Sequence, residues 1–192
     1  MNDMLKMQQM AGCELVRATK IVDQLPLRGR FQVEHWRGGK MIGKYKFANA
    51  ITNEGKNKLL NVMFHDVAAI DAWYILLVDG AGTPVLAAAD VYAQINGTNG
   101  WDEFDLIDEV TRPAWTEGAA ASQSITNASP VVFNISGSGN VYGLGIVGGG
   151  TTPDILNDSA GGGTLWAAAA FASGTVAVLN GDQLKVTYTV NA

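Results

Sequence analysis

The chain has 192 residues, of which 47% are hydrophobic, 16% are charged and one is a cysteine, Cys13. This length suits a single domain that buries its own core, and one cysteine excludes an internal disulfide framework and a cysteine-based zinc site. No apolar run approaches the ~18 residues that span a bilayer, and polar residues interrupt the first 27 residues too often for a signal peptide. We therefore expect a protein made and used in a reducing cytoplasm, or assembled there into something larger, with no membrane partner.

Charge is distributed unevenly along the chain. Residues 1–60 hold eleven Lys/Arg and five acids, a net charge of +6, whereas residues 61–192 hold two Lys/Arg and thirteen acids, a net charge of −11. An acidic body behind a basic front part suggests that the two parts face different partners. The basic residues are spread along the chain and few aromatic residues accompany them. This pattern favours a negatively charged protein surface over nucleic acid as the partner of the basic part.

The segment 1–28 predicts a separable N-terminal arm. Its apolar residues follow an imperfect helical spacing, and helices this short are marginal in isolation. A segment with apolar anchors and few packing partners of its own is best explained as one that docks on a neighbouring subunit. A disordered terminus is the alternative. The candidate partner-binding residues in and beside the arm are Met4, Met7, Met10, Arg17, Lys20, Arg28 and Arg30.

A hairpin and a helix are predicted next. Residues 30–36 (RFQVEHW) and 41–47 alternate as strands do, and Gly38-Gly39 between them suits a two-residue turn. Residues 49–64 change to a helical period, with Thr52 or Asn53 as the capping residue. This segment is the one well-formed helix that we expect. His35 has no cysteine or second histidine near it in sequence, so we interpret it as a half-exposed structural residue.

The middle of the chain combines a very apolar strand with a long polar loop. Residues 72–79 (AWYILLVD) are apolar on both faces, which predicts a covered central strand. The loop 85–118 contains an acidic run whose spacing does not fit an EF-hand. A cation site or a pair of catalytic carboxylates is conceivable, but we favour either a solvated acidic loop or a surface for the basic part of a neighbouring copy. The candidate partner-binding residues are Asp102, Glu103 and Asp105, next to Asp108 and Glu109.

Short strands are predicted throughout the second half of the chain. Asn180-Gly181 lies between TVAVL and the alternating run 184–190, which predicts a hairpin there. Glycines inside the strand 141–147 indicate a bulge or a close backbone approach. The remaining strand predictions are 124–126, 131–135 and 165–172.

These elements predict an all-β fold, an antiparallel β-sandwich of the jelly-roll kind over residues 29–192, with one short helix and the N-terminal arm. No nucleophile–base order, zinc motif or phosphate loop is present, so we assign no catalytic, cofactor or metal residue and expect no enzyme. The predicted core residues are Trp73, Ile75, Leu77, Phe133, Leu184, Val186 and Tyr188.

Four segments in this order resemble a group of small phage virion proteins. They are residues 49–60 (NAITNEGKNKLL), the strand 73–79, residues 109–116 (EVTRPAWT) and the ending 165–190. Proteins of this group look like jelly-roll capsid cement or decoration proteins, and some are described only as tail or virion structural proteins. The resemblance implies a location on the capsid surface, the major capsid protein and further copies of itself as partners, and no catalytic residues. The arm lies outside it.

A carbohydrate-binding or host-adhesion module is the second class that the sequence leaves open. Jelly rolls also serve as lectins, and three aromatic residues lie in polar loops where they would offer stacking platforms. These residues are Tyr92, Trp101 and Trp115.

Overall fold

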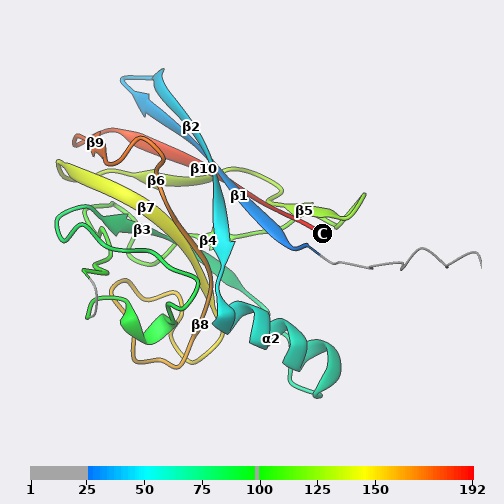
Figure 1. Ribbon diagram of the computed structural model, residues 1–192. Coiled ribbons are helices and arrows are strands. Elements are labelled where there is room, and N and C mark those ends of the chain that lie inside the picture. Colours follow the sequence, from blue (N-terminus) through cyan, green and yellow to red (C-terminus); the bar gives the residue numbers. More distant parts are fainter. Residues whose placement is uncertain (1–25, 98–99) are drawn as a thin grey trace, which may run out of the picture.

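The computed structural model describes residues 26–97 and 100–192. Ten strands form one antiparallel sheet in the order β4-β3-β7-β8-β2-β1-β10-β5, with β6 also paired to β10 and β9 to β7 (Figure 1). The prediction of an all-β antiparallel fold is therefore confirmed. The elements are β1 (Arg28–Arg37), β2 (Lys40–Ile51), α2 (Asn53–Phe64), β3 (Trp73–Asp79), the 3₁₀ turn η1 (Tyr92–Gln94), β4 (Ala114–Trp115), β5 (Ser124–Thr126), β6 (Val131–Asn134), β7 (Gly139–Gly148), β8 (Thr164–Ala170), β9 (Val176–Val178) and β10 (Gln183–Asn191).

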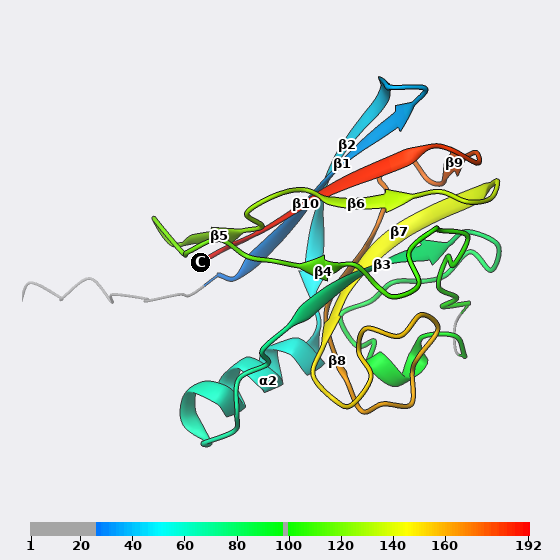
Figure 2. The ribbon, with the colours of Figure 1, turned by 180° about the vertical axis from the view of Figure 1, so that it is seen from behind.

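The sheet curls over on itself at β2 and so forms two packed layers. β2 pairs with β1 along most of its length but with β8 only at Ala50 and Ile51. One layer consists of β2, β1, β10, β5 and β6, and the other of β8, β7, β3, β4 and β9 (Figure 2). Because the two layers enclose a shared core, the predicted sandwich is the arrangement found.

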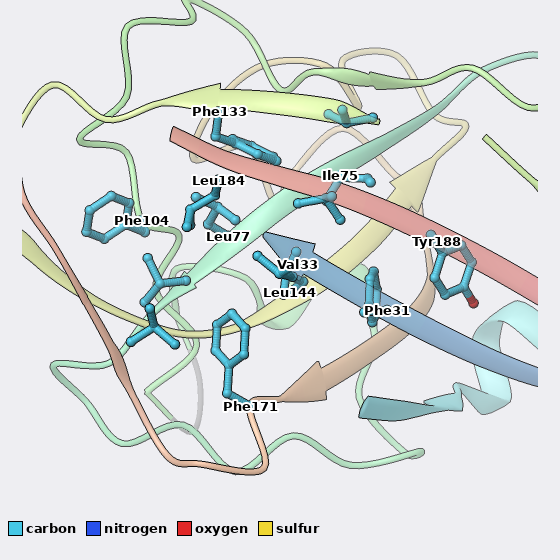
Figure 3. Packing of buried hydrophobic residues seen from close by; sticks show 14 of the residues in the cluster. Phe31, Val33, Ile75, Leu77, Phe104, Phe133, Leu144, Phe171, Leu184 and Tyr188 are labelled. Atoms are coloured by element: carbon cyan, nitrogen blue, oxygen red, sulfur yellow. The ribbon is translucent and has the colours of Figure 1, made fainter. Parts of the chain in front are cut away.

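The core between the layers is built from the inward positions of alternating strands. In β10, Leu184, Val186 and Tyr188 are buried while the residues between them are partly exposed. Ile75 and Leu77 of β3 reach the same cluster from the opposite layer (Figure 3). All the predicted core residues are buried except Trp73, which is only half-buried and packs against the edge of the cluster.

The strand β3 is covered on both faces, as its sequence predicts. Ile75 and Leu77 point into the main core, whereas Leu76 and Val78 belong to a second cluster with Tyr92. The long loop after β3 supplies this second cover, because it folds back over the outer face of the strand. The polar loop of the sequence is therefore a structural layer in its own right.

The first hairpin forms as predicted, and the last one does not. Gly38 and Gly39 have φ of 55° and 75°, the left-handed conformations that a tight two-residue turn between paired strands requires. Across Asn180-Gly181, however, β9 pairs with β7 in one layer and β10 pairs with β1, β6 and β5 in the other. The chain crosses between layers at this turn, so the local hairpin signal was overridden by tertiary pairing.

Helix α2 is held to the body at its first turn. Thr52 caps it, accepting a hydrogen bond from the N–H of Gly55 at 2.9 Å. A Cβ at Gly55 would lie 2.8 Å from the carbonyl oxygen of Trp166, so glycine lets the helix lie against β8. The predicted cap is confirmed. Toward its C-terminus the helix exposes Met63 and Phe64, the latter 81% accessible.

The described chain enters the sheet at Arg28, the last residue of the predicted arm. Residues 1–25, with the candidates Met4, Met7, Met10, Arg17 and Lys20, lie outside the described residues. Within residues 26–97 and 100–192, no helix has the length and apolar character needed to cross a membrane.

Candidate functional site

Basic side chains gather on the outward face of the layer that contains β1, β2 and β10. Exposed and buried positions alternate at the start of β1, so Arg28 and Arg30 point away from the core. The pairing register places Lys46 beside Gln32 and both Lys44 and Lys185 beside Glu34, and directly paired residues share a face. We call Arg28, Arg30, Lys44, Lys46 and Lys185 the basic face.

One carboxylate lies among these five cations. Lys44 Nζ donates to Glu34 Oε1 at 2.9 Å, and this hydrogen bond holds the pKa of Glu34 below its usual range. Lys185 Nζ lies 4.5 Å from the centroid of the Trp36 ring, a cation–π contact. No carboxylate in the described part of the chain forms an ion pair with the remaining members, Arg28, Arg30 and Lys46.

The basic face gathers residues that lie far apart in the sequence. In the sequence these basic residues are spread along the chain, a pattern that favours an acidic protein surface over nucleic acid as the partner. Because side chains alternate along each strand and the strands pair side by side, separated residues meet on one surface. The charge is dispersed in sequence and concentrated in space.

The acidic run of the polar loop does not form one cluster. Asp102, Asp105 and Asp108 are exposed, but Glu103 is only 5% accessible. Glu109 accepts hydrogen bonds from the backbone N–H of Asn134 at 3.1 Å and from its Nδ2 at 2.7 Å. Among residues 26–97 and 100–192, no group of three or more Asp, Glu, His or Cys side chains is placed to hold a metal ion.

Glu103 is an internal ion-pair partner, so its prediction as a partner-binding residue is wrong. Arg112, also buried, donates from Nη2 at 2.7 Å and from Nε at 3.0 Å to this carboxylate. Burial by itself lowers the pKa of Arg112, and the bonds to Glu103 outweigh it, so the pKa is raised overall. A buried carboxylate needs such a partner, because an unpaired charge in the interior is strongly destabilising.

The guanidinium of Arg112 also ties the polar loops together. It donates to the hydroxyl of Tyr92 at 3.1 Å and to the carbonyls of Pro153 and Asp158 at 3.0 and 2.8 Å. Burial raises the pKa of Tyr92 to about 12, and its hydroxyl donates to Asp158 Oδ2 at 2.6 Å. These bonds satisfy the buried groups internally, so the network is structural. The only sequence signal for this network is Arg112, the arginine of EVTRPAWT, because a single cation in an acidic segment is expected to pair with a carboxylate.

The aromatic residues predicted as carbohydrate platforms are not on the surface. Tyr92 and Trp101 are each 1% accessible and Trp115 is 7% accessible. Trp101 donates from Nε1 to Asp90 Oδ2 at 3.0 Å inside the second cluster. Enclosed in this cluster, the rings of Tyr92 and Trp101 cannot stack on a sugar, so the prediction of these two as platforms is wrong; Trp115 lies in the core and contacts solvent only where it lines an apolar pocket.

His35 is buried rather than half-exposed. Its Nε2 lies 2.7 Å from Asp182 Oδ2, and Arg37 donates two hydrogen bonds of 2.7 Å to the same carboxylate. The bonds from Arg37 are the main cause that holds the pKa of Asp182 well below its usual range, and the N–H of Leu179 adds to them. Asp182 follows the turn at Asn180-Gly181, so these bonds fasten the crossover between layers to β1.

No protein-family model matches the chain, and no curated protein matches it.

Proposed function

We propose that this protein is a non-enzymatic structural protein of a phage virion, a cement or decoration protein that binds the outside of the shell and clamps neighbouring major capsid subunits. The resemblance of four segments to small phage virion proteins motivates the proposal. The observation that carries it is the basic face, a sheet surface with five cations and one carboxylate.

A charged surface spread over three paired strands suits a partner that is itself broad and repeated. Charge complementarity at an interface sets orientation and association rate more than affinity, which fits a protein that must bind many equivalent sites in one register. An acidic outer surface of the capsid is the partner that this face would recognise. The exposed Asp102, Asp105 and Asp108 offer the opposite charge to the basic face of a further copy.

The carbohydrate-binding alternative has lost its support. Its predicted platforms are buried, and the aromatic ring on the basic face, Trp36, is occupied by Lys185. We therefore advance a single function.

Electron microscopy of virions labelled with an antibody against this protein tests the proposal. We expect label distributed over the head surface in a repeated pattern. Label confined to the tail, or absent from purified particles, would overturn it. A matched sample of particles assembled without the protein serves as the labelling control.

A further inference from the structure

An apolar pocket of about 300 Å³ lies at one end of the sandwich, where the two layers and helix α2 meet. Both layers contribute to it, and so do the helix and the residue just before β1. Its lining includes Leu27, Leu59, Trp73, Trp115, Trp166 and Tyr188. An apolar cavity of half this size, about 150 Å³, binds benzene or xenon in another protein, so this volume is sufficient for a side chain.

The walls of the pocket are largely aromatic. The indole N–H of Trp115 is buried and has no hydrogen-bond partner in the described residues. Trp166 Nε1, in contrast, donates to the hydroxyl of Tyr188 at 3.0 Å. Neither indole N–H presents an accessible free donor to the pocket, so its lining suits an apolar side chain.

The chain itself leads to this pocket. Leu27 lines it, and residues 1–25 precede Leu27 directly by way of Pro26. We propose that residues 1–25 of the same chain occupy the pocket, with methionine side chains from Met4, Met7 and Met10 placed against its aromatic walls. Methionine is unbranched and adapts to irregular spaces, and its sulfur makes favourable contacts with aromatic rings.

Residues 1–25 of the same chain outcompete the corresponding segment of another copy because their effective concentration at the pocket is higher. A segment tethered by a short linker is present at an effective concentration on the order of mM, far above that of any separate copy in a dilute solution. A chain can span up to ~3.3–3.6 Å per residue, so the methionines are within reach of a pocket that begins at Leu27. In an assembled shell, the N-terminal arm of a neighbouring copy would meet the same pocket. Docking of the arm on a neighbouring subunit is what the sequence predicts.

Tryptophan fluorescence of the full-length chain tests this inference, which does not depend on the proposed virion function. Three of the five tryptophans line the pocket, Trp73, Trp115 and Trp166. The test variant carries Met4→Gln, Met7→Gln and Met10→Gln. It should show a red-shifted emission and stronger quenching by acrylamide than the natural chain. Met41→Gln is the matched control, because Met41 is exposed on the first hairpin and lies outside the pocket; it should leave both quantities unchanged.

A synthetic peptide of residues 1–25 completes the test. At micromolar concentration it should bind the triple variant and reverse the red shift, but it should not bind the natural chain, whose pocket is filled. Quenching that is unchanged in the triple variant, or equal binding of the peptide to both proteins, would overturn the inference. A concentration-dependent dimer that the triple variant fails to form would also overturn it, because the occupant would then be the segment of a second copy.

Discussion

Arg112 and Glu103 form a two-pronged ion pair in the interior of the loop layer, with both side chains almost completely inaccessible. The same carboxylate accepts a hydrogen bond from the N–H of Asn157 at 2.7 Å. One ion pair therefore joins the loop after β3 to the loop before β8. It converts two glycine-rich and polar segments into a fixed layer over β3.

Replacing Arg112 with Met should destabilise the protein by about 3–5 kcal/mol, because the change leaves Glu103 buried without its partner charge. Urea denaturation followed by fluorescence measures the free energy of unfolding. Asp102→Asn, at an exposed neighbour of Glu103, should stay within about 0.5 kcal/mol of the natural protein. A loss below about 1 kcal/mol for Arg112→Met would mean that the carboxylate is solvated rather than buried.

Replacing Leu77 with Ala should cost about 2–5 kcal/mol, as truncation of buried leucines does. Leu77 is 1% accessible and lies on the core face of β3. Leu60→Ala is the matched control, because Leu60 is 54% accessible on α2 and its truncation removes little buried surface. Equal losses in the two variants would contradict the placement of β3 at the centre of the sandwich.

Replacing Gly143 with Ala should destabilise the protein by about 1–3 kcal/mol through overpacking. A Cβ at this position would collide with the carbonyl oxygen of Ala169 and lie 2.9 Å from Cα of Ala170, so β7 and β8 would have to separate. At Gly118 the nearest atom is 3.5 Å away, an ordinary contact, and Gly118→Ala should be tolerated. Thermal unfolding should show a lower midpoint temperature for Gly143→Ala than for Gly118→Ala.

Asp182→Asn should lower the free energy of unfolding near neutral pH and make that free energy less dependent on pH in acid. The pKa of Asp182 is lowered in the folded state, chiefly by its hydrogen bonds from Arg37. Its stabilising effect is therefore present above the unfolded-state pKa of about 3.9 and is lost as the pH falls through that value toward the folded one. Unfolding measured from about pH 7 down to pH 2 should show a smaller decline in the variant. The exposed Asp108→Asn should keep the steep decline of the natural protein.

Reversing charge on the basic face should reduce loading onto particles. Arg30→Glu combined with Lys46→Glu places two acids on the surface that we propose to face the capsid. Added salt should likewise weaken loading of the natural protein, because exposed charges are screened. Sedimentation of particles with bound protein gives the occupancy, and Lys56→Glu combined with Lys58→Glu on α2 makes the same change in net charge away from the basic face. Loading that tolerates both molar salt and the double reversal would contradict the role of this face.

Local patterns in the sequence determined the strands, the helix cap and much of the core. The alternation of Leu184, Val186 and Tyr188 with polar residues, the Gly38-Gly39 turn and the capping Thr52 each act over a few residues. Side-chain alternation, turn geometry and capping are short-range effects, so they can be deduced without knowing the rest of the fold.

Pairing between distant segments was decided only by the tertiary structure. The Asn180-Gly181 turn satisfies the local rule for a hairpin, yet the bonds of Asp182 to Arg37 and His35 fix it as a crossover between layers. The residues of the acidic run are alike in sequence. In the structure Glu103 is buried and paired with Arg112, whereas Asp102, Asp105 and Asp108 are exposed. Burial and charge pairing depend on which residues meet across the fold, and the free energy of those contacts exceeds the preference of a short segment.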